Sequence, residues 1–454
     1  MRILNVYTLE FGEFFDSEVP KYAILSHRWG KHEVSYKGMR KRDKRMPSGA
    51  GYDKILNFCR LVRKTTKLEW AWIDTCCIDK SSSAELSEAI NSMIRWYRRS
   101  AVCYAYLADV DSSSHTPKPL EEQFEQSDWF CRGWTLQELL GPELVIFHDV
   151  NWTVIGHKCP VRYDQSKGQY RCQEAEPLCG SPLNSKISRI TNIEEDCLDF
   201  KSRLNEKTIA HLMSWAAVRR TTRIEDTAYC LMGLFDLNFP PLYGEGDKAF
   251  LRLQEELVLR HNDPSVFFWT GDQDVLPQSD LLVMRPMFAS QPADFAVGAP
   301  NVVEPRWNLS TSFSVSNRGL QWTSLMTVYK IPGTTKELLV VDSADLVDNL
   351  KPYALMPHNA EDKEKKLLPT SKVVLFDWGR ERFHRVHQLP PEASLDLCSP
   401  QTPERRTVLI SLRNGQNYRL YTGFPRSNPK LYAVHPVKKS PSDRAVPNQH
   451  EEDR

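Results

Sequence analysis

The sequence predicts an α/β protein whose N-terminal region folds around a parallel sheet, followed by helices and then by a β-rich region. Two observations favour this fold. Short, almost continuously apolar runs alternate with helical periods near the start of the chain, as in parallel sheets that are covered on both faces. From about residue 265 the pattern changes to short β-rich segments. The predicted limits are 1–155 for the α/β domain, 156–262 for an irregular insertion and helical extension, 263–437 for a β-rich domain and 438–454 for a disordered tail.

The N-terminal elements alternate between strands and helices. The expected strands are the apolar runs at 22–26, 70–73, 102–107 and 144–147. Apolar side chains with helical spacing cover 52–65 and 84–98, and Ser82 or Ser83 is the expected cap of the second helix. Because ligands of such sheets bind at the carboxyl ends of the strands, residues that follow these runs are candidates for a site.

Later segments follow the same logic. Helices are expected at Thr208–Arg219, after the capping-box spacing of Thr222–Glu225 and through Leu234, and at Asp247–Arg260. Pro, Gly, Asn and Asp separate the later β-rich runs, as in an antiparallel sandwich or barrel. These runs are 266–269, 313–315, 338–341, 373–376 and 407–410. No catalytic constellation is recognised among them.

Composition excludes some classes of function. The 59 basic and 58 acidic residues give a net charge of +1, so no global field favours nucleic acid, and no nucleic-acid reading motif occurs. No apolar run reaches the ~20 residues of a membrane span, and the start lacks a secretory signal. Eleven cysteines lie scattered, several in apolar runs, which favours reduced thiols in the cytoplasm. The adjacent Cys76 and Cys77 lack a second Cys/His pair, so no metal site is expected.

Trp134 and Glu138 form the most informative pair. Their spacing of four places both on one face of a helix, so that an aromatic wall stands beside a carboxylate. Poor solvation raises the pKa of such a carboxylate and suits it to acid, base or cation-stabilising chemistry. The same spacing fits an amphipathic helix in which Trp134 packs inward and Glu138 reaches solvent. On spacing alone, this second interpretation is the commoner one.

Polar residues follow two of the predicted strands. Ser26, His27 and Arg28 end the first run, and Asp74 ends the second. Each has an ordinary explanation: Ser26 can cap a turn, Asp74 can anchor its loop, and His27 and Arg28 can be solvated. Their shared position at the carboxyl edge of the sheet favours a binding site, with the Trp134–Glu138 helix close to it.

The chain resembles the fungal heterokaryon-incompatibility (HET) domain in five ordered blocks. The segments 213–216, 221–226 and 242–246 look like the region that commonly follows that domain. The resemblance implies a toxic effector of non-self recognition, which triggers cell death when incompatible fungal strains fuse. It also implies self-association or an activating incompatibility partner protein. The five blocks are YAILSHRWG at 22–30, GYDKI at 51–55, WIDTCCIDK at 72–80, ELSEAINSM at 85–93 and RGWTLQEL at 132–139.

The order of these elements is also similar to the TIR domain, a flavodoxin-like sheet of plant and bacterial immunity. In NAD-cleaving TIR domains the essential residue is a glutamate four residues after a tryptophan, and Glu138 and Trp134 match that pair. The resemblance implies a flavodoxin-like sheet, NAD as substrate rather than cofactor, and Glu138 as the catalytic residue.

The remaining candidates would bind the substrate. Trp134 would shape the pocket, and His27 and Arg28 would meet the pyrophosphate or adenine side, with Ser26 beside them at the strand end. Asp74 would shape the adjoining loop. The alternative is a death-signalling module without catalysis, because TIR-like sheets assemble through their helical faces, and in that case Trp134 and Glu138 would be structural or part of an interface.

Overall fold

The protein is described by a computed structural model, and its chain divides into two compact units. The first comprises Met1–Leu257 together with Ser290–Ala296, and the second begins at Val258. The structure describes residues 1–15, 17–41, 49–113, 118–164, 169–172, 180–200, 204–269, 281–285, 287–296, 312–316, 319–330, 337–342, 372–377, 383–388, 404–410, 418–421 and 435–436.

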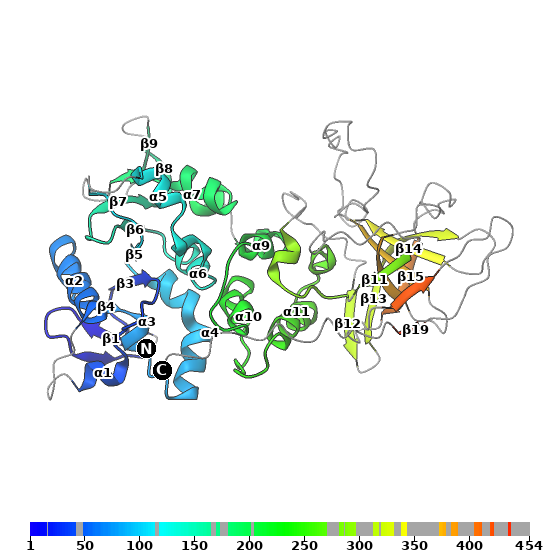
Figure 1. Ribbon diagram of the computed structural model, residues 1–454, viewed down its shortest axis with the longest axis horizontal. Coiled ribbons are helices and arrows are strands. Elements are labelled where there is room, and N and C mark those ends of the chain that lie inside the picture. Colours follow the sequence, from blue (N-terminus) through cyan, green and yellow to red (C-terminus); the bar gives the residue numbers. More distant parts are fainter. Residues whose placement is uncertain are drawn as a thin grey trace. The chain divides into compact units, whose positions relative to one another are not determined.

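An eight-stranded sheet forms the core of the first unit, with the order β10-β7-β6-β5-β3-β4-β1-β2 (Figure 1). Its centre is the parallel set β4-β3-β5-β6, whose strands are almost entirely buried. The strands are β1 (Arg2–Asn5), β2 (Phe11–Glu13), β3 (Tyr22–His27), β4 (Trp70–Trp72), β5 (Val102–Tyr106), β6 (Val145–His148), β7 (Val154–Lys158) and β10 (Ser181–Pro182).

The sheet is mixed, which corrects the expectation of a parallel sheet. β1 pairs antiparallel with both β2 and β4, and β7 pairs antiparallel with β6. Only the short link 149–153 joins β6 to β7, and a link of this length cannot return the chain for a parallel pair. β7 and β10 carry the sheet past residue 155, where the sequence suggested an irregular insertion.

Helices flank the sheet. On one face Phe58 of α2 (Ala50–Thr65) packs against Tyr104 of β5, with ring centroids 5.7 Å apart. Trp72 of β4 packs against Tyr97 of α4 (Ser83–Arg99), with centroids 5.9 Å apart. Ile24 of β3 is in register with Trp72 of β4 and with Cys103 of β5, so Trp72 and Cys103 point to the same face of the sheet. Tyr104 follows Cys103 and therefore points to the opposite face. The expected cap of α4 is Ser82, whose hydroxyl accepts from the Glu85 amide at 3.3 Å.

The three helices predicted after the sheet are present. They are α9 (Ile209–Ala216), α10 (Asp226–Met232) and α11 (Lys248–Arg260). The other short elements are α1 (Tyr36–Arg40), α3 (Asp74–Cys77), α5 (Leu120–Glu125), η1 (Asp128–Cys131), α6 (Thr135–Leu140), β8 (Val161–Asp164), β9 (Gln169–Cys172), α7 (Asn184–Thr191), α8 (Glu195–Leu198), η3 (Leu204–Glu206), η4 (Gly233–Phe235) and η6 (Pro292–Phe295).

Two findings bear on the setting of the chain. Among the described residues, no helix has the length and apolar character needed to cross a membrane. Seven cysteines of the described ranges are free thiols, whereas Cys159 is disulfide-bonded, which the cysteine pattern did not predict.

The described part of the second unit contains a nine-stranded sheet, in which β12 to β16, β11, β18 and β19 follow one another and β17 pairs with β13 and β16. The run 266–269 was expected to be a strand, but Pro264–Phe267 forms the 3₁₀ turn η5. Pro264 is the first residue of this turn, and the Asp263 side chain caps it by accepting a hydrogen bond from the Ser265 amide at 2.8 Å. A domain over 263–437 stays a prediction. The strands are β11 (Leu281–Arg285), β12 (Ser312–Ser316), β13 (Gly319–Lys330), β14 (Glu337–Asp342), β15 (Lys372–Asp377), β16 (Phe383–Gln388), β17 (Glu404–Ile410), β18 (Tyr418–Tyr421) and β19 (His435–Pro436).

Candidate functional site

A cavity of about 300 Å³ opens at the carboxyl ends of β3 and β4. Five of the six residues predicted from the sequence line it, and the sixth, Ser26, lies directly behind it in contact with Glu138. Apolar side chains of α4 form another part of the wall. The five predicted residues are His27, Arg28, Asp74, Trp134 and Glu138.

Glu138 lies in the first turn of α6 and is only 7% exposed. The interpretation in which this carboxyl group reaches solvent is therefore wrong, and Trp134, just before the helix, is the less buried of the two. Burial raises the pKa of Glu138 to about 8, the nearby Asp74 adds to the rise, and a hydrogen bond from Ser26 opposes it. The cavity thus contains a carboxyl group that changes charge near neutral pH.

Ser26 connects the sheet to this carboxyl group. It is fully buried at the end of β3, where its hydroxyl donates to Glu138 Oε2 and accepts from the indole Nε1 of Trp129 at 2.8 Å. Trp129 belongs to η1, directly before α6, and its ring packs edge-on against Phe147 of β6. The chain Trp129–Ser26–Glu138 therefore fixes the orientation of the carboxyl group. Trp129 was not predicted as a site residue, because nothing in its local sequence pattern indicates its distant partner.

His27 lies between two carboxyl groups. Its Nε2 atom is 3.9 Å from Glu33 Oε2 and 3.9 Å from Asp74 Oδ1, which is too long for hydrogen bonds. Burial, with nearby lysines, lowers the pKa of His27 well below its usual value, so the ring is neutral at pH 7. A neutral ring beside two carboxyl groups is a poor ligand for pyrophosphate.

Asp74 contacts Trp29, which also lines the cavity. Its Oδ2 accepts from the Trp29 indole at 2.7 Å, and burial raises its pKa. The ammonium group of Lys80 lies 3.3 Å from the centre of the Trp29 ring, in a cation–π contact. Arg28, half exposed, is paired with Asp128 of η1.

A segment after α9 closes the cavity. Gly133 N donates to Arg220 O at 2.9 Å and Arg220 N donates to Cys131 O at 2.6 Å, so residues 219–226 run alongside the start of α6. Asp226 of α10 accepts from Tyr243 at 2.8 Å and from the Trp134 indole. Five further residues line the cavity and were not predicted from the sequence. Four of them fall in the segments 221–226 and 242–246, which resemble the region after the HET domain. The five residues are Arg132, Thr222, Arg223, Asp226 and Tyr243.

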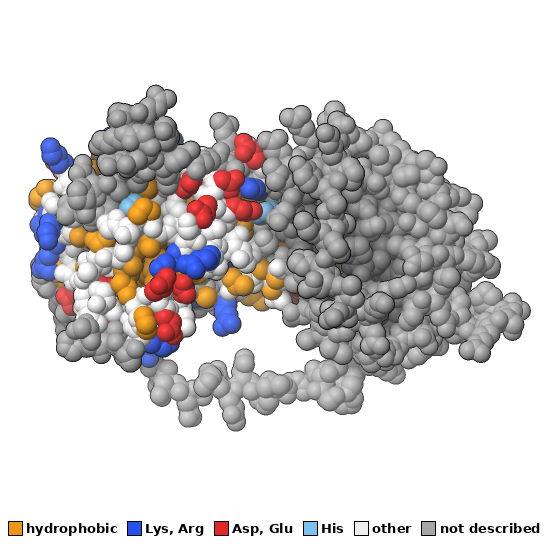
Figure 2. Space-filling view, turned by 90° about the horizontal axis from the view of Figure 1, so that it is seen from above, with side chains coloured by type: hydrophobic (Ala, Val, Ile, Leu, Met, Phe, Trp, Pro, Cys, Tyr) orange, Lys and Arg blue, Asp and Glu red, His pale blue; other side chains and the backbone are white. Residues whose placement is uncertain are grey.

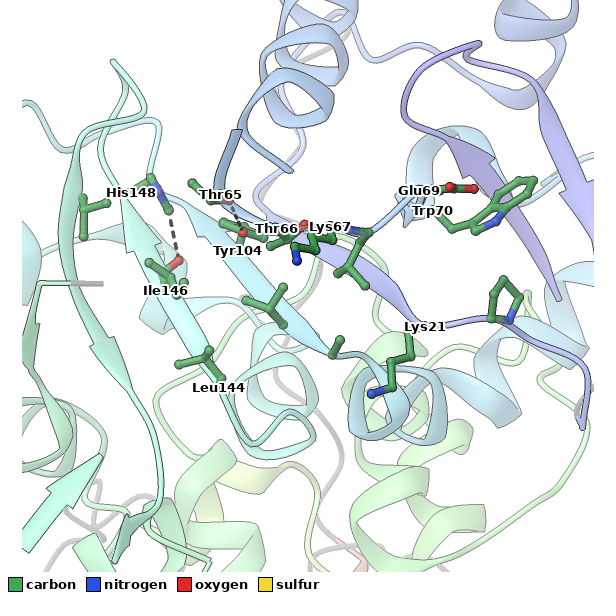
Figure 3. A pocket seen from close by; sticks show the side chains of 15 residues that line it. Lys21, Thr65, Thr66, Lys67, Glu69, Trp70, Tyr104, Leu144, Ile146 and His148 are labelled. Carbon is green, nitrogen blue, oxygen red and sulfur yellow. Dashed lines mark hydrogen bonds between the residues drawn. The ribbon is translucent and has the colours of Figure 1, made fainter. Parts of the chain in front are cut away.

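A larger cavity of about 700 Å³ lies elsewhere on the sheet, beside the end of α2 (Figure 3). Its lining includes residues at the amino ends of the parallel strands, such as Lys21, Trp70 and Val102. The polar contacts drawn there are Thr65 with Tyr104 at 2.7 Å and the His148 ring with Ile146 O at 3.3 Å. None of the predicted site residues lines it, and it is at the edge opposite to the one where α/β sheets bind ligands.

Charges of both signs occur together on the surface of the described residues, where basic and acidic side chains form adjacent clusters (Figure 2). Within the described ranges, no group of three His, Cys, Asp or Glu side chains is placed to hold a metal ion.

Comparisons with known proteins agree with part of the sequence-based recognition. Residues 22–121 match the family described as heterokaryon incompatibility protein (HET). Vegetative incompatibility protein HET-E-1 of Podospora anserina is 40% identical over 246 residues, which is 53% of this chain and 16% of that relative. No solved structure matches the chain. These findings support the recognition of a HET domain in the N-terminal part of the chain.

Proposed function

We propose that this chain is a cell-death effector of the heterokaryon-incompatibility type, acting in fungal non-self recognition, and that it hydrolyses the nicotinamide–ribose bond of NAD. The observation that carries the proposal is the buried Glu138 carboxyl group, held by Ser26 beside Trp134 in a cavity at the carboxyl ends of β3 and β4. The resemblance to the HET family supports the incompatibility role.

The fold supports the TIR-like part of the proposal. In chain order the central parallel strands β3, β4, β5 and β6 are numbered one to four, and their order in the sheet is 2-1-3-4. This is the beginning of the flavodoxin-like order 2-1-3-4-5, in which ligands bind where the strand order reverses. β3 and β5 flank that position, and Ser26 and His27 end β3.

The chemistry needs few groups. Water replaces nicotinamide at the anomeric carbon: the C–N bond breaks with its electron pair going to the neutral nicotinamide, a C–O bond forms, and one proton is released, leaving ADP-ribose. The positive charge that develops on the sugar is stabilised by a carboxylate in a site with little water. Glu138 in its ionised form would supply that charge, and Trp134 would shape the wall beside it.

A mutation of the carboxyl group tests the proposal. Glu138→Gln keeps the size of the side chain and its contact with Ser26 but removes the charge. We expect the full chain to release nicotinamide from NAD and Glu138→Gln to lose at least about 100-fold in rate, as is typical when an electrostatic stabiliser is removed. Chromatographic quantification of nicotinamide would measure this. Glu88→Gln, an exposed change on the far side of α4 from the cavity lining, is the matched control.

The alternative function is a death-signalling module without catalysis. It predicts no nicotinamide release by the wild type, even at high concentration or with crowding agents that promote assembly. It also predicts that Glu138 substitutions change self-association, measured by light scattering. Equal NAD consumption by Glu138→Gln and the wild type would refute the assignment of Glu138.

The proposal places the effector in the cytoplasm, where NAD is available, and assigns its activation to self-association or to an incompatibility partner protein. Seven cysteines among the described residues are free thiols, as is usual in a reducing compartment, whereas the disulfide at Cys159 is unusual there. No metal or cofactor has a role in the proposed chemistry.

A further inference from the structure

We propose that Arg132 and Arg223, together with Thr222, form a phosphate-binding subsite at the wall of this cavity, so that its ligand is a phosphorylated nucleotide rather than a nucleoside. This inference rests on the proposed function and names the part of the chain that would hold the pyrophosphate. All three residues line the cavity, and two of them come from the segment that follows α9.

Arg223 is positioned to donate. Its guanidinium carbon lies 4.5 Å from the centre of the Tyr243 ring, and the Tyr243 hydroxyl is itself held by Asp226 at 2.8 Å. Contact with an aromatic ring restricts the guanidinium group while leaving N–H groups on its edges for an anion. Within the described residues, Arg223 has no ion pair of the kind that occupies Arg28.

Arg132 is fixed on the facing strand-like segment. One of its terminal nitrogens donates to the Thr222 hydroxyl at 2.9 Å, and its own carbonyl accepts from Arg219 at 2.9 Å. The close approach of the two segments needs a glycine, because a Cβ at Gly133 would lie 2.6 Å from Thr221 Cγ2. The Arg132 guanidinium also lacks an ion pair among the described side chains, and a planar fork of donors suits phosphate oxygens.

The charges of the cavity favour an anion on this wall. Arg28, Lys80, Arg132 and Arg223 line it, against Asp74, Glu138 and Asp226. Burial raises the pKa of the three carboxyl groups, but it also lowers the pKa of Lys80, and Arg28 is already paired with Asp128. The positive charge available to an anion therefore comes from Arg132 and Arg223. The sequence placed His27 and Arg28 at the pyrophosphate or adenine side, but the ring of His27 is buried and neutral and Arg28 is paired with Asp128. Arg132 and Arg223, which have no ion pair among the described residues, are better placed to bind the pyrophosphate.

Direct binding measurements test the subsite. Isothermal titration of the full chain carrying Glu138→Gln would compare ADP-ribose, which has a pyrophosphate, with nicotinamide riboside, which has none. Arg223→Gln and Arg132→Gln are each expected to weaken ADP-ribose binding about 10- to 100-fold, the usual effect of losing a hydrogen bond to a charged group. Riboside binding should stay within about twofold. The matched control is Arg60→Gln, an exposed arginine of α2 that contacts Asn57.

The possible results separate this inference from the proposed function. Selective weakening of ADP-ribose would support the subsite even if the wild type does not cleave NAD. If NAD is cleaved and neither arginine variant changes the KM for NAD, the cleavage activity stands and the subsite is wrong. Unchanged ADP-ribose affinity in both variants, equal weakening of riboside and ADP-ribose, or no ADP-ribose binding at all would each overturn it.

Discussion

Replacement of Ser26 by alanine is expected to change how the rate of NAD cleavage depends on pH. The Ser26 hydroxyl donates to the Glu138 carboxylate and so stabilises its charged form against burial. Such a bond contributes about 1.5–3 kcal/mol, which equals about one to two pKa units. In Ser26→Ala the pKa of Glu138 therefore rises further above its value of about 8.

The size of the effect follows from the ionised fraction. With a pKa of about 8, about one tenth of Glu138 is ionised at pH 7. A rise of one to two units lowers this fraction, and hence the rate, about 10- to 100-fold at pH 7. The loss should shrink as the pH is raised, because the carboxylate ionises again at higher pH.

The assay is initial nicotinamide release between about pH 6 and 9.5 at NAD concentrations well below the KM, where the rate reports the pKa values of the free protein, for the wild type, Ser26→Ala and Ser26→Thr. Threonine keeps a hydroxyl and should restore the wild-type profile if its methyl group is accommodated. Trp129→Phe is a control, because it removes the donor to Ser26 but leaves the Ser26–Glu138 bond. Thermal unfolding of each variant checks that the fold is kept.

A parallel fall in rate at every pH, with the ionisation limb unmoved, would refute the reasoning. It would mean that Ser26 supports the fold through its contact with Trp129 and has no effect on the charge of Glu138.

Two further predictions concern stability. Because the pKa of Glu138 is raised from 4.5 to about 8 on folding, the stability contributed by its neutral form is full below about pH 4.5 and is lost as the pH rises toward 8. At pH 7, Glu138→Gln should therefore be more stable than the wild type by on the order of 3 kcal/mol, whereas near pH 4 it should be no more stable. Urea unfolding at both pH values measures this difference, and an equal gain at both would contradict the prediction. Gly133→Ala should destabilise the fold by about 1–3 kcal/mol, because its Cβ would lie 2.6 Å from Thr221 Cγ2 and 3.0 Å from the Cys230 sulfur. An unchanged denaturation midpoint would show that the neighbouring side chains can move to accommodate the methyl group.

Much of the site was predictable because the carboxyl edge of a parallel sheet is encoded locally. The apolar runs at 22–26 and 70–73 become the buried strands β3 and β4, and the residues that end them lie at one edge. That rule placed His27, Arg28 and Asp74 around one cavity without any knowledge of their contacts. Helical spacing placed Trp134 and Glu138 on its wall.

The remaining features depend on contacts between residues far apart in the chain. The carboxyl group of Glu138 accepts a hydrogen bond from Ser26, 112 residues away, and the amphipathic pattern of α6 has no information about that partner. Likewise, the antiparallel pairing of β6 with β7 follows from the short link between them, whereas apolar character alone predicted a parallel sheet. The role of Tyr243 could not be predicted, because its contact with Asp226 depends on how α10 and the next loop pack.

These contacts bear on which part of the chain forms the functional unit. The family match ends at residue 121, before Trp134 and Glu138. Arg223 and Tyr243, which line the cavity, both lie more than 100 residues beyond residue 121. The burial that raises the pKa of Glu138 thus depends on both the strand end at Ser26 and the segment after α9, which pairs with the backbone on either side of Arg132. A fragment ending near residue 155 would keep Ser26 and α6 but lose this wall and cut β7, so Glu138 would be more hydrated and its pKa would return toward 4.5. The proposed chemistry would therefore need α6 and the segment after α9 as well as the matched segment.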